Sequence, residues 1–191
     1  KDADFIIEAV PEKMDIKKDV FGALDEMAPE HAILATNTSS LSVSKIAEVT
    51  NRPHKVVGTH FVNMPQRIDR FVGPEISIML PLVEVVKARR TSEETIEVTK
   101  GFLRKMGKYP VVVKDTPAFI ANRFIIRMGL EAAYALSEAD LKEIDAAVMY
   151  SELGAPMGIF QLIDMIGLDV ALDILDYMGE VLGDAYTAPP G

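Results

Sequence analysis

The sequence predicts an α/β region followed by an all-α region. Up to about residue 115, short apolar runs alternate with stretches of helical spacing, which is typical of a parallel sheet covered by helices. After Pro117, helical spacing dominates as far as about Leu182. A length of 191 residues suits one domain or two small ones. We therefore expect two domains, residues 1–115 and 116–191.

The α/β region begins with the apolar run Phe5–Ile7, which predicts a buried strand that ends in a loop. Apolar residues at near-helical spacing predict a helix over Lys13–Met27, which Pro29 ends. A second strand is expected at Ala32–Ala35, and the polar turn Thr36–Ser40 follows it.

The next elements continue the alternation. A short helix is expected at about Val43–Val49, with Ser42 as its cap. Apolar runs predict a third strand at Val56–Phe61 and a fourth at Leu82–Val86.

The last helix and strand of this region carry clear boundary signals. A helix is expected over Ser92–Met106, where Thr91 and Glu94 form a capping box and Gly107 ends the helix. Val111–Val113 predicts the final strand.

Composition excludes several classes of function. The net charge of -9 disfavours nucleic acid, because an acidic chain repels a phosphate backbone. The chain has no cysteine, which excludes disulfides and thiolate metal sites, and no metal site is expected. No apolar run is long enough to span a membrane, and the start carries no signal pattern, so a cytoplasmic location is expected.

His60 is the first candidate for chemistry, because it ends a predicted strand just before a loop. Ligands of open α/β sheets bind at the carboxyl ends of the strands, and a histidine there can exchange protons near neutral pH. The alternative is a structural histidine held by hydrogen bonds. His31 and His54 lie in polar connections and are expected at the surface.

Glu84 is the second candidate, because it interrupts the apolar run Leu82–Val86. A carboxylate in a buried strand is costly unless it is paired. It either points outward from an edge strand or meets His60, where it would fix the tautomer and stabilise the imidazolium.

Two polar positions are less specific. Pro117 suits the first position of a helix, with Thr116 as its cap. Asn122 then lies on this helix among apolar neighbours, where its side-chain amide needs a hydrogen-bond partner. That partner is either a group on a neighbouring helix or a bound ligand. The polar residues Asn37–Ser40 can bind a ligand or merely cap their turn. The sequence contains no Gly-x-Gly-x-x-Gly, P-loop, zinc pattern or Gly-x-Ser-x-Gly.

Taken together, several segments resemble the L-specific 3-hydroxyacyl-CoA dehydrogenase family, which includes 3-hydroxybutyryl-CoA dehydrogenase. They occur in family order and cover nearly the whole chain: Glu8–Glu12, Asn37–Leu41, Gly58–Asn63, Pro81–Val85, Lys114–Arg123, Pro156–Asp164 and Gly167–Asp169. Together and in this order these motifs are specific, although each alone is weak. The resemblance implies a partial Rossmann-type domain that binds NAD, followed by a helical domain that forms a homodimer.

The resemblance also implies roles for individual residues. His60 would be the general base that takes the hydroxyl proton of an acyl-CoA substrate, and Glu84 would orient it. Ser39 would hydrogen-bond the substrate oxygen, and Asn122 would help to place the substrate. Five further residues match positions that line the cofactor: Ala9, Glu12, Lys17, Asn37 and Asn63.

The chain departs from the family in two respects. The opening β-α-β unit with its glycine loop is missing and so is the family's last helical stretch, so the resemblance implies truncation at both ends. The separation of His60 and Glu84 is about twice that of the family, which implies an insertion at about residues 64–79 that covers the site, displaces Glu84 or bulges outward.

Two other functions remain open on the sequence. The first is a non-catalytic fragment or degenerate copy that folds and dimerises but binds NAD poorly, because a pyrophosphate needs a glycine-rich turn at a helix N-terminus. The second is a related β-hydroxyacid or sugar-acid dehydrogenase of the same architecture.

Overall fold

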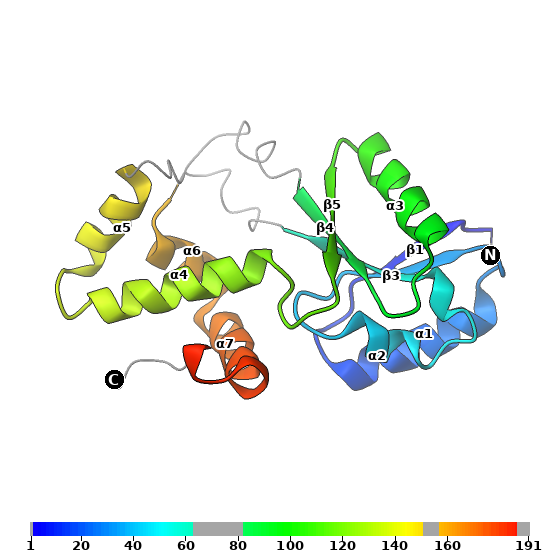
Figure 1. The fold of residues 1–191 in the computed structure, drawn as a ribbon, viewed down its shortest axis with the longest axis horizontal. Coiled ribbons are helices and arrows are strands. Elements are labelled where there is room, and N and C mark those ends of the chain that lie inside the picture. The colour runs from blue at the N-terminus through cyan, green and yellow to red at the C-terminus, as the bar shows by residue number, and fades with distance from the viewer. Residues whose placement is uncertain (1, 63–81, 151–156, 187–191) are drawn as a thin grey trace. The chain divides into compact units, whose positions relative to one another are not determined.

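The computed structural model describes residues 2–62, 82–150 and 157–186, which form two compact units (Figure 1). Of the described residues, 2–62 and 82–119 belong to the first unit and 120–150 and 157–186 to the second. Each unit contains its own buried apolar residues.

The first unit is built on a five-stranded sheet. Its strands follow one another in chain order: β1 (Phe5–Glu8), β2 (Ile33–Thr36), β3 (Val56–Phe61), β4 (Leu82–Lys87) and β5 (Tyr109–Lys114). The expected parallel sheet is confirmed as the dominant arrangement, since β1, β2 and β3 pair in parallel and so do β4 and β5. The pair of β3 with β4 is antiparallel. The amino end of β4 therefore lies at the edge of the sheet where β1, β2 and β3 end.

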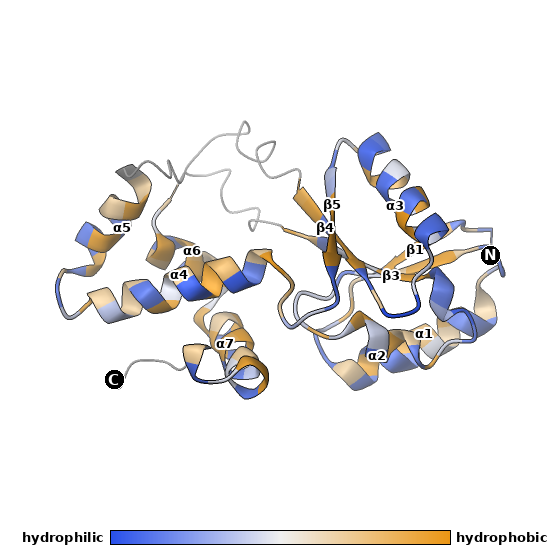
Figure 2. Ribbon diagram, in the orientation of Figure 1, coloured by the Kyte–Doolittle hydropathy of each residue, from blue (hydrophilic) through white to orange (hydrophobic). Residues whose placement is uncertain are grey.

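Helices cover both faces of this sheet: α1 (Met14–Met27) and α2 (Val43–Ala47) on one face and α3 (Glu93–Lys105) on the other. Phe21 of α1 and Ile46 of α2 share a core cluster with Leu34 and Val86, whereas Ile96 of α3 belongs to the opposite cluster. Figure 2 shows the strands coloured mainly as hydrophobic. Successive residues of a strand face alternate sides, so each strand contributes to both clusters.

The two expected helix caps of the first unit have different outcomes. Ser42 caps α2 as predicted, because its side chain accepts a hydrogen bond from the Lys45 amide. The prediction of Thr91 as the cap of α3 is wrong, since Ser92 accepts from the Thr95 amide instead. The Thr91 hydroxyl is already engaged, because it donates to the Val56 carbonyl oxygen at 2.7 Å.

The second unit is helical, with α4 (Ala121–Ala135), α5 (Leu141–Tyr150), α6 (Ile159–Ile166) and α7 (Leu168–Leu182). Asp145 of α5 is buried and accepts hydrogen bonds from the Phe160 and Gln161 amides, which fixes the start of α6. A Cβ atom at Gly158 would lie 2.1 Å from the Asp145 carboxyl carbon, so only glycine fits there. In the described part of the chain no helix is long and apolar enough to cross a membrane.

The expected helix start at Pro117 is wrong, because α4 begins at Ala121. The intervening residues Ala118 and Phe119 have φ angles of 55° and 49°, in the left-handed region that breaks a right-handed helix. Both side chains are fully buried. Burial in the core of the first unit thus overrides the local helix signal of Pro117.

Candidate active site

His60 and Glu84 form the centre of the candidate site. They are directly opposite each other on the antiparallel strands β3 and β4, so their side chains share one face of the sheet. The Nδ1 atom of His60 lies 2.7 Å from Oε2 of Glu84. Both residues are buried, with exposed fractions of 5% and 2%. The predicted meeting of the two side chains is confirmed.

This geometry sets the chemistry of the imidazole. A carboxylate only accepts hydrogen bonds, so in neutral His60 the Nδ1 atom carries the proton and Nε2 keeps its lone pair. When Nε2 takes a proton, the carboxylate of Glu84 stabilises the resulting imidazolium. The pair can therefore act as a general base and its positioning partner.

The alternative in which Glu84 points outward from an edge strand is wrong, because β4 lies between β3 and β5. The predicted insertion at about 64–79 falls outside the described residues. Glu84 itself keeps its place in the sheet, since β3 and β4 are in register from Gly58 with Val86 to Phe61 with Val83.

The turn after β2 is bound to the loop after β1 through Glu12. One carboxylate oxygen of Glu12 accepts hydrogen bonds from the Thr38 hydroxyl at 2.6 Å and from the Ser39 and Ser40 amides at 2.8 and 3.0 Å. Burial alone would raise the pKa of Glu12. The Thr38 hydroxyl, the Lys17 ammonium and the two amides together hold the pKa of this carboxyl below its ordinary value. Glu12 thereby fixes the backbone that carries Ser39.

Lys17 completes this network from α1. Its Nζ lies 2.8 Å from Oε1 of Glu8 and 3.4 Å from Oε2 of Glu12, and the residue is 1% exposed. The other oxygen of Glu8 accepts a hydrogen bond from the Thr36 hydroxyl at the end of β2. Lys17 therefore balances two carboxylates at the carboxyl edge of the sheet. Its ammonium is enclosed, and the cofactor role implied for Lys17 stays a prediction.

The remaining predicted cofactor residues lie at the same edge or outside the described residues. Ala9 is exposed directly after β1, and Asn37 is half-buried directly after β2. The Asn37 side-chain oxygen accepts a hydrogen bond from the Phe61 amide, next to His60. Asn63 lies outside the described residues.

Asn122 belongs to the second unit, where it is half-buried in the first turn of α4. The structure therefore brings His60 and Glu84 into contact and places Ser39 on a turn of the same unit. The role implied for Asn122 stays a prediction. His31 and His54 are exposed, as expected, and His31 pairs with Asp4.

Two residues near the site were not predicted from the sequence. Asp115 accepts hydrogen bonds from the Ser42 hydroxyl and from the Val43 and Ser44 amides, so it holds the start of α2. The Phe119 ring lies against the His60 ring, with centroids 5.7 Å apart. Neither contact could be predicted from the local pattern of apolar residues, since each joins segments far apart in the sequence.

The edge of the sheet fits part of a dinucleotide cofactor. Ala9 and Asn37 offer small or uncharged polar surface where a ligand of an α/β sheet binds. A pyrophosphate needs a glycine-rich turn, and the 191 residues contain none of the Gly-x-Gly-x-x-Gly type. The residues present thus fit the uncharged portion of such a cofactor.

Comparisons with known proteins match both units of the chain. Residues 1–116 match the family model "3-hydroxyacyl-CoA dehydrogenase, NAD binding domain", and residues 119–191 match "3-hydroxyacyl-CoA dehydrogenase, C-terminal domain". A 3-hydroxybutyryl-CoA dehydrogenase of Clostridioides difficile is 45% identical over 195 residues, covering 100% of this chain and 64% of the relative. The mitochondrial hydroxyacyl-coenzyme A dehydrogenase of Sus scrofa is 38% identical and is covered to 52%.

Solved structures give the same result. The (S)-3-hydroxybutyryl-CoA dehydrogenase of Ralstonia eutropha superposes with a TM-score of 0.84 at 33% identity, covering 97% of this chain and 62% of that one. The chain thus spans between about half and two thirds of the relatives named here. Both units match the family, and the chain belongs to the 3-hydroxyacyl-CoA dehydrogenase family.

Proposed function

We propose that the protein catalyses the reversible NAD-dependent oxidation of (S)-3-hydroxyacyl-CoA to 3-oxoacyl-CoA, in fatty-acid or butanoate metabolism. The observation that carries the proposal is the buried His60–Glu84 pair at the carboxyl edge of the sheet. Oxidation of an alcohol needs a base for the hydroxyl proton, and Nε2 of His60 has the lone pair for it. NAD, when bound, supplies the hydride acceptor.

The other site residues would act on the substrate and cofactor. Ser39 would donate a hydrogen bond to the substrate oxygen, held in place by the contacts of its turn with Glu12. Asn122 would help to place the substrate. Ala9, Glu12, Lys17, Asn37 and Asn63 would line or support the cofactor.

Activity towards acetoacetyl-CoA tests this proposal. The chain, joined at Lys1 to the residues that precede the matching segment in the Clostridioides difficile relative, should oxidise NADH when acetoacetyl-CoA is added. His60→Gln should lower the rate by about 10²–10⁴-fold, the usual contribution of a general base. His54→Gln should leave the rate unchanged, because His54 is exposed and lies in the turn before β3. An inactive protein, or an active His60→Gln, would reject the assignment.

A non-catalytic module is the second candidate, favoured by the lack of a glycine-rich turn in the sequence. Calorimetry with NADH on the chain of 191 residues separates the two. Micromolar binding would contradict the non-catalytic function. Turnover of free β-hydroxyacids instead of acyl-CoA would favour a related dehydrogenase of the same fold.

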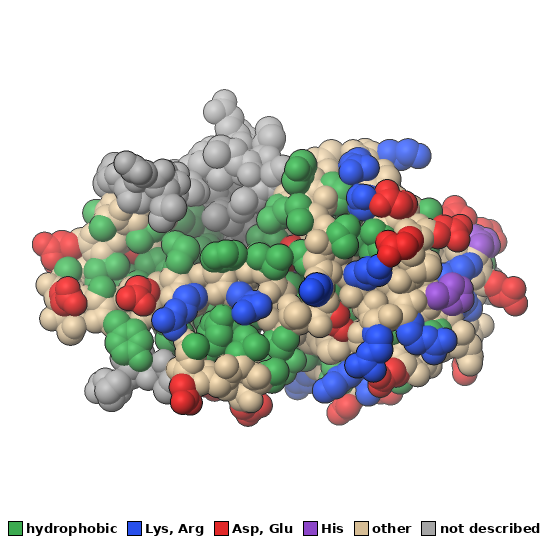
Figure 3. Space-filling view, viewed as in Figure 1, with side chains coloured by type: hydrophobic (Ala, Val, Ile, Leu, Met, Phe, Trp, Pro, Cys, Tyr) green, Lys and Arg blue, Asp and Glu red, His purple; other side chains and the backbone are tan. Residues whose placement is uncertain are grey.

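We also propose that the protein forms a homodimer through its helical unit. Apolar side chains gather on the visible face of this unit, whereas Lys, Arg, Asp and Glu gather on that of the first (Figure 3). Phe124 of α4 and Leu168 and Leu172 of α7 are 68%, 64% and 55% exposed. Such exposed large apolar side chains are typical of an interaction surface.

A further inference from the structure

The backbone around Ala118 and Phe119 is unusual within the described residues. They are the two non-glycine residues there with positive φ, at 55° and 49°, and they are adjacent. The left-handed conformation is unfavourable for a residue with a Cβ atom, so tertiary contacts must hold it. Two anchors of the first unit flank the turn: the Phe119 amide donates to the Thr116 carbonyl oxygen, and Asp115 binds the start of α2.

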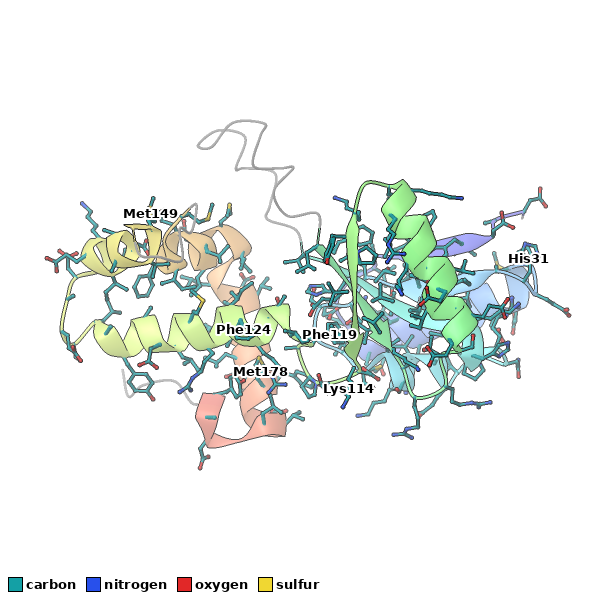
Figure 4. The ribbon with its side chains drawn as sticks, turned by 45° about the horizontal axis from the view of Figure 1, so that its top comes forward. His31, Lys114, Phe119, Phe124, Met149 and Met178 are labelled. Atoms are coloured by element: carbon teal, nitrogen blue, oxygen red, sulfur yellow. The ribbon has the colours of Figure 1, made fainter. Side chains whose placement is uncertain are left out.

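The turn places the Phe119 ring on the face of the sheet that carries His60. Phe119 is fully buried in the cluster that also contains Phe21 and Val86. Its ring is tilted by 52° to the imidazole of His60 at a centroid distance of 5.7 Å, the geometry of an aromatic pair. Figure 4 labels Phe119 on the connection that follows β5, near Lys114.

Glu84 and Phe119 therefore hold His60 in different ways. The carboxylate fixes the Nδ1 atom by a directional hydrogen bond. This hydrogen bond alone does not prevent rotation of the imidazole ring. The Phe119 ring packs against the imidazole, restricts that rotation and excludes water from the buried side of the ring. We propose that Phe119 is a positioning residue that keeps the His60 imidazole in the orientation and tautomer needed for proton transfer.

This proposal rests on the proposed function only in naming His60 as the base. The alternative is that Phe119 merely fills the core. Phe21 provides the matched control, because it is an equally buried phenylalanine in the same cluster. Leucine retains an apolar core side chain at either position, so Phe119→Leu and Phe21→Leu should both remain folded.

The test is ¹⁵N NMR of the three histidines in the intact chain, with His60 assigned through His60→Gln. The ring-nitrogen shifts at high pH report the ratio of the two neutral tautomers without requiring activity. Wild type should populate the Nδ1–H tautomer. Phe119→Leu should lower the ratio of the Nδ1–H tautomer to the Nε2–H tautomer by about tenfold, the size of effect expected for the loss of one aromatic contact.

Phe21→Leu should keep the wild-type tautomer ratio. Ala118→Gly should keep it too, because this variant retains the Phe119 ring and only removes the steric cost of the positive φ at residue 118. An unchanged ratio in Phe119→Leu, or an equal change in Phe21→Leu, would overturn the proposal. Loss of dehydrogenase activity with an unchanged tautomer ratio would also count against it. If the protein is inactive but the tautomer ratio still falls in Phe119→Leu, the positioning role of Phe119 is supported and only the proposed function is rejected.

Discussion

Glu12 connects two loops at the edge of the sheet, and its charge is part of that connection. The hydroxyl, amides and ammonium around it all favour the ionised carboxylate. The pattern Glu8–Glu12 indicated only that the residue matches a family position. Its four hydrogen bonds to Thr38, Ser39 and Ser40 could not be predicted, because they depend on the approach of a loop 26–28 positions away.

The lowered pKa of Glu12 predicts a pH-dependent stability. Folding stabilises the ionised form, so this contribution is complete above the ordinary pKa of 4.5 and is lost as the pH falls through the lower folded value. Glu12→Gln should therefore cost about 1 kcal/mol at pH 7, a modest value because the side chain is partly exposed. Urea unfolding measures this.

The difference between wild type and Glu12→Gln should narrow as the pH falls below 4.5. Glu26→Gln is the control, since Glu26 is exposed on α1. A difference that stays constant or grows in acid would show that Glu12 is not stabilised as a carboxylate.

At the scale of elements, β3 and α2 approach unusually closely at Gly58. A Cβ atom there would lie 2.6 Å from Cβ of Val86 and 2.9 Å from Cγ2 of Val43. Gly58 lies directly opposite Val86 in the sheet, so the missing side chain lets β4 and α2 pack around the strand that carries His60.

Gly58→Ala should destabilise the protein by about 1–3 kcal/mol, because overpacking forces the sheet or α2 to move. Gly22→Ala should instead stabilise it by about 0.5–1 kcal/mol, the usual gain in a helix interior. Gly22 lies within α1, and a Cβ atom added there would meet no neighbouring side chain within 4 Å. Thermal unfolding of the two variants tests this, since the melting temperature should fall in Gly58→Ala and rise in Gly22→Ala. Equal changes in the two variants would contradict the close packing around Gly58.

The strands and helices of the first unit could be predicted because their apolar periodicity is local. β3 has the predicted bounds and β4 extends one residue further. The antiparallel pairing of β3 with β4 and the late start of α4 could not be predicted. Both depend on contacts between distant segments, such as the burial of Phe119. For the same reason His60 and Glu84 could be identified individually, whereas their contact required the fold.

At the scale of the whole molecule, the exposed apolar residues of the helical unit predict self-association. Leu168 and Leu172 are one turn apart on α7 and both are exposed. Leu168→Glu with Leu172→Glu should weaken dimerisation by at least about tenfold in sedimentation equilibrium, since charge is disfavoured in the core of an interface.

Met27→Glu is the control for this prediction, because Met27 is 74% exposed on α1 of the first unit. A wild-type chain that sediments as a monomer would contradict the homodimer. So would a Met27→Glu variant that dissociates as readily as the double variant.

The central claim is that His60 and Glu84 act as one catalytic unit. A double-mutant cycle on kcat/KM for acetoacetyl-CoA reduction tests it most directly, in the chain extended at Lys1. We predict that His60→Gln alone loses about as much rate as His60→Gln with Glu84→Gln, because Glu84 acts only through the imidazole. Losses that multiply in the double variant would contradict the account.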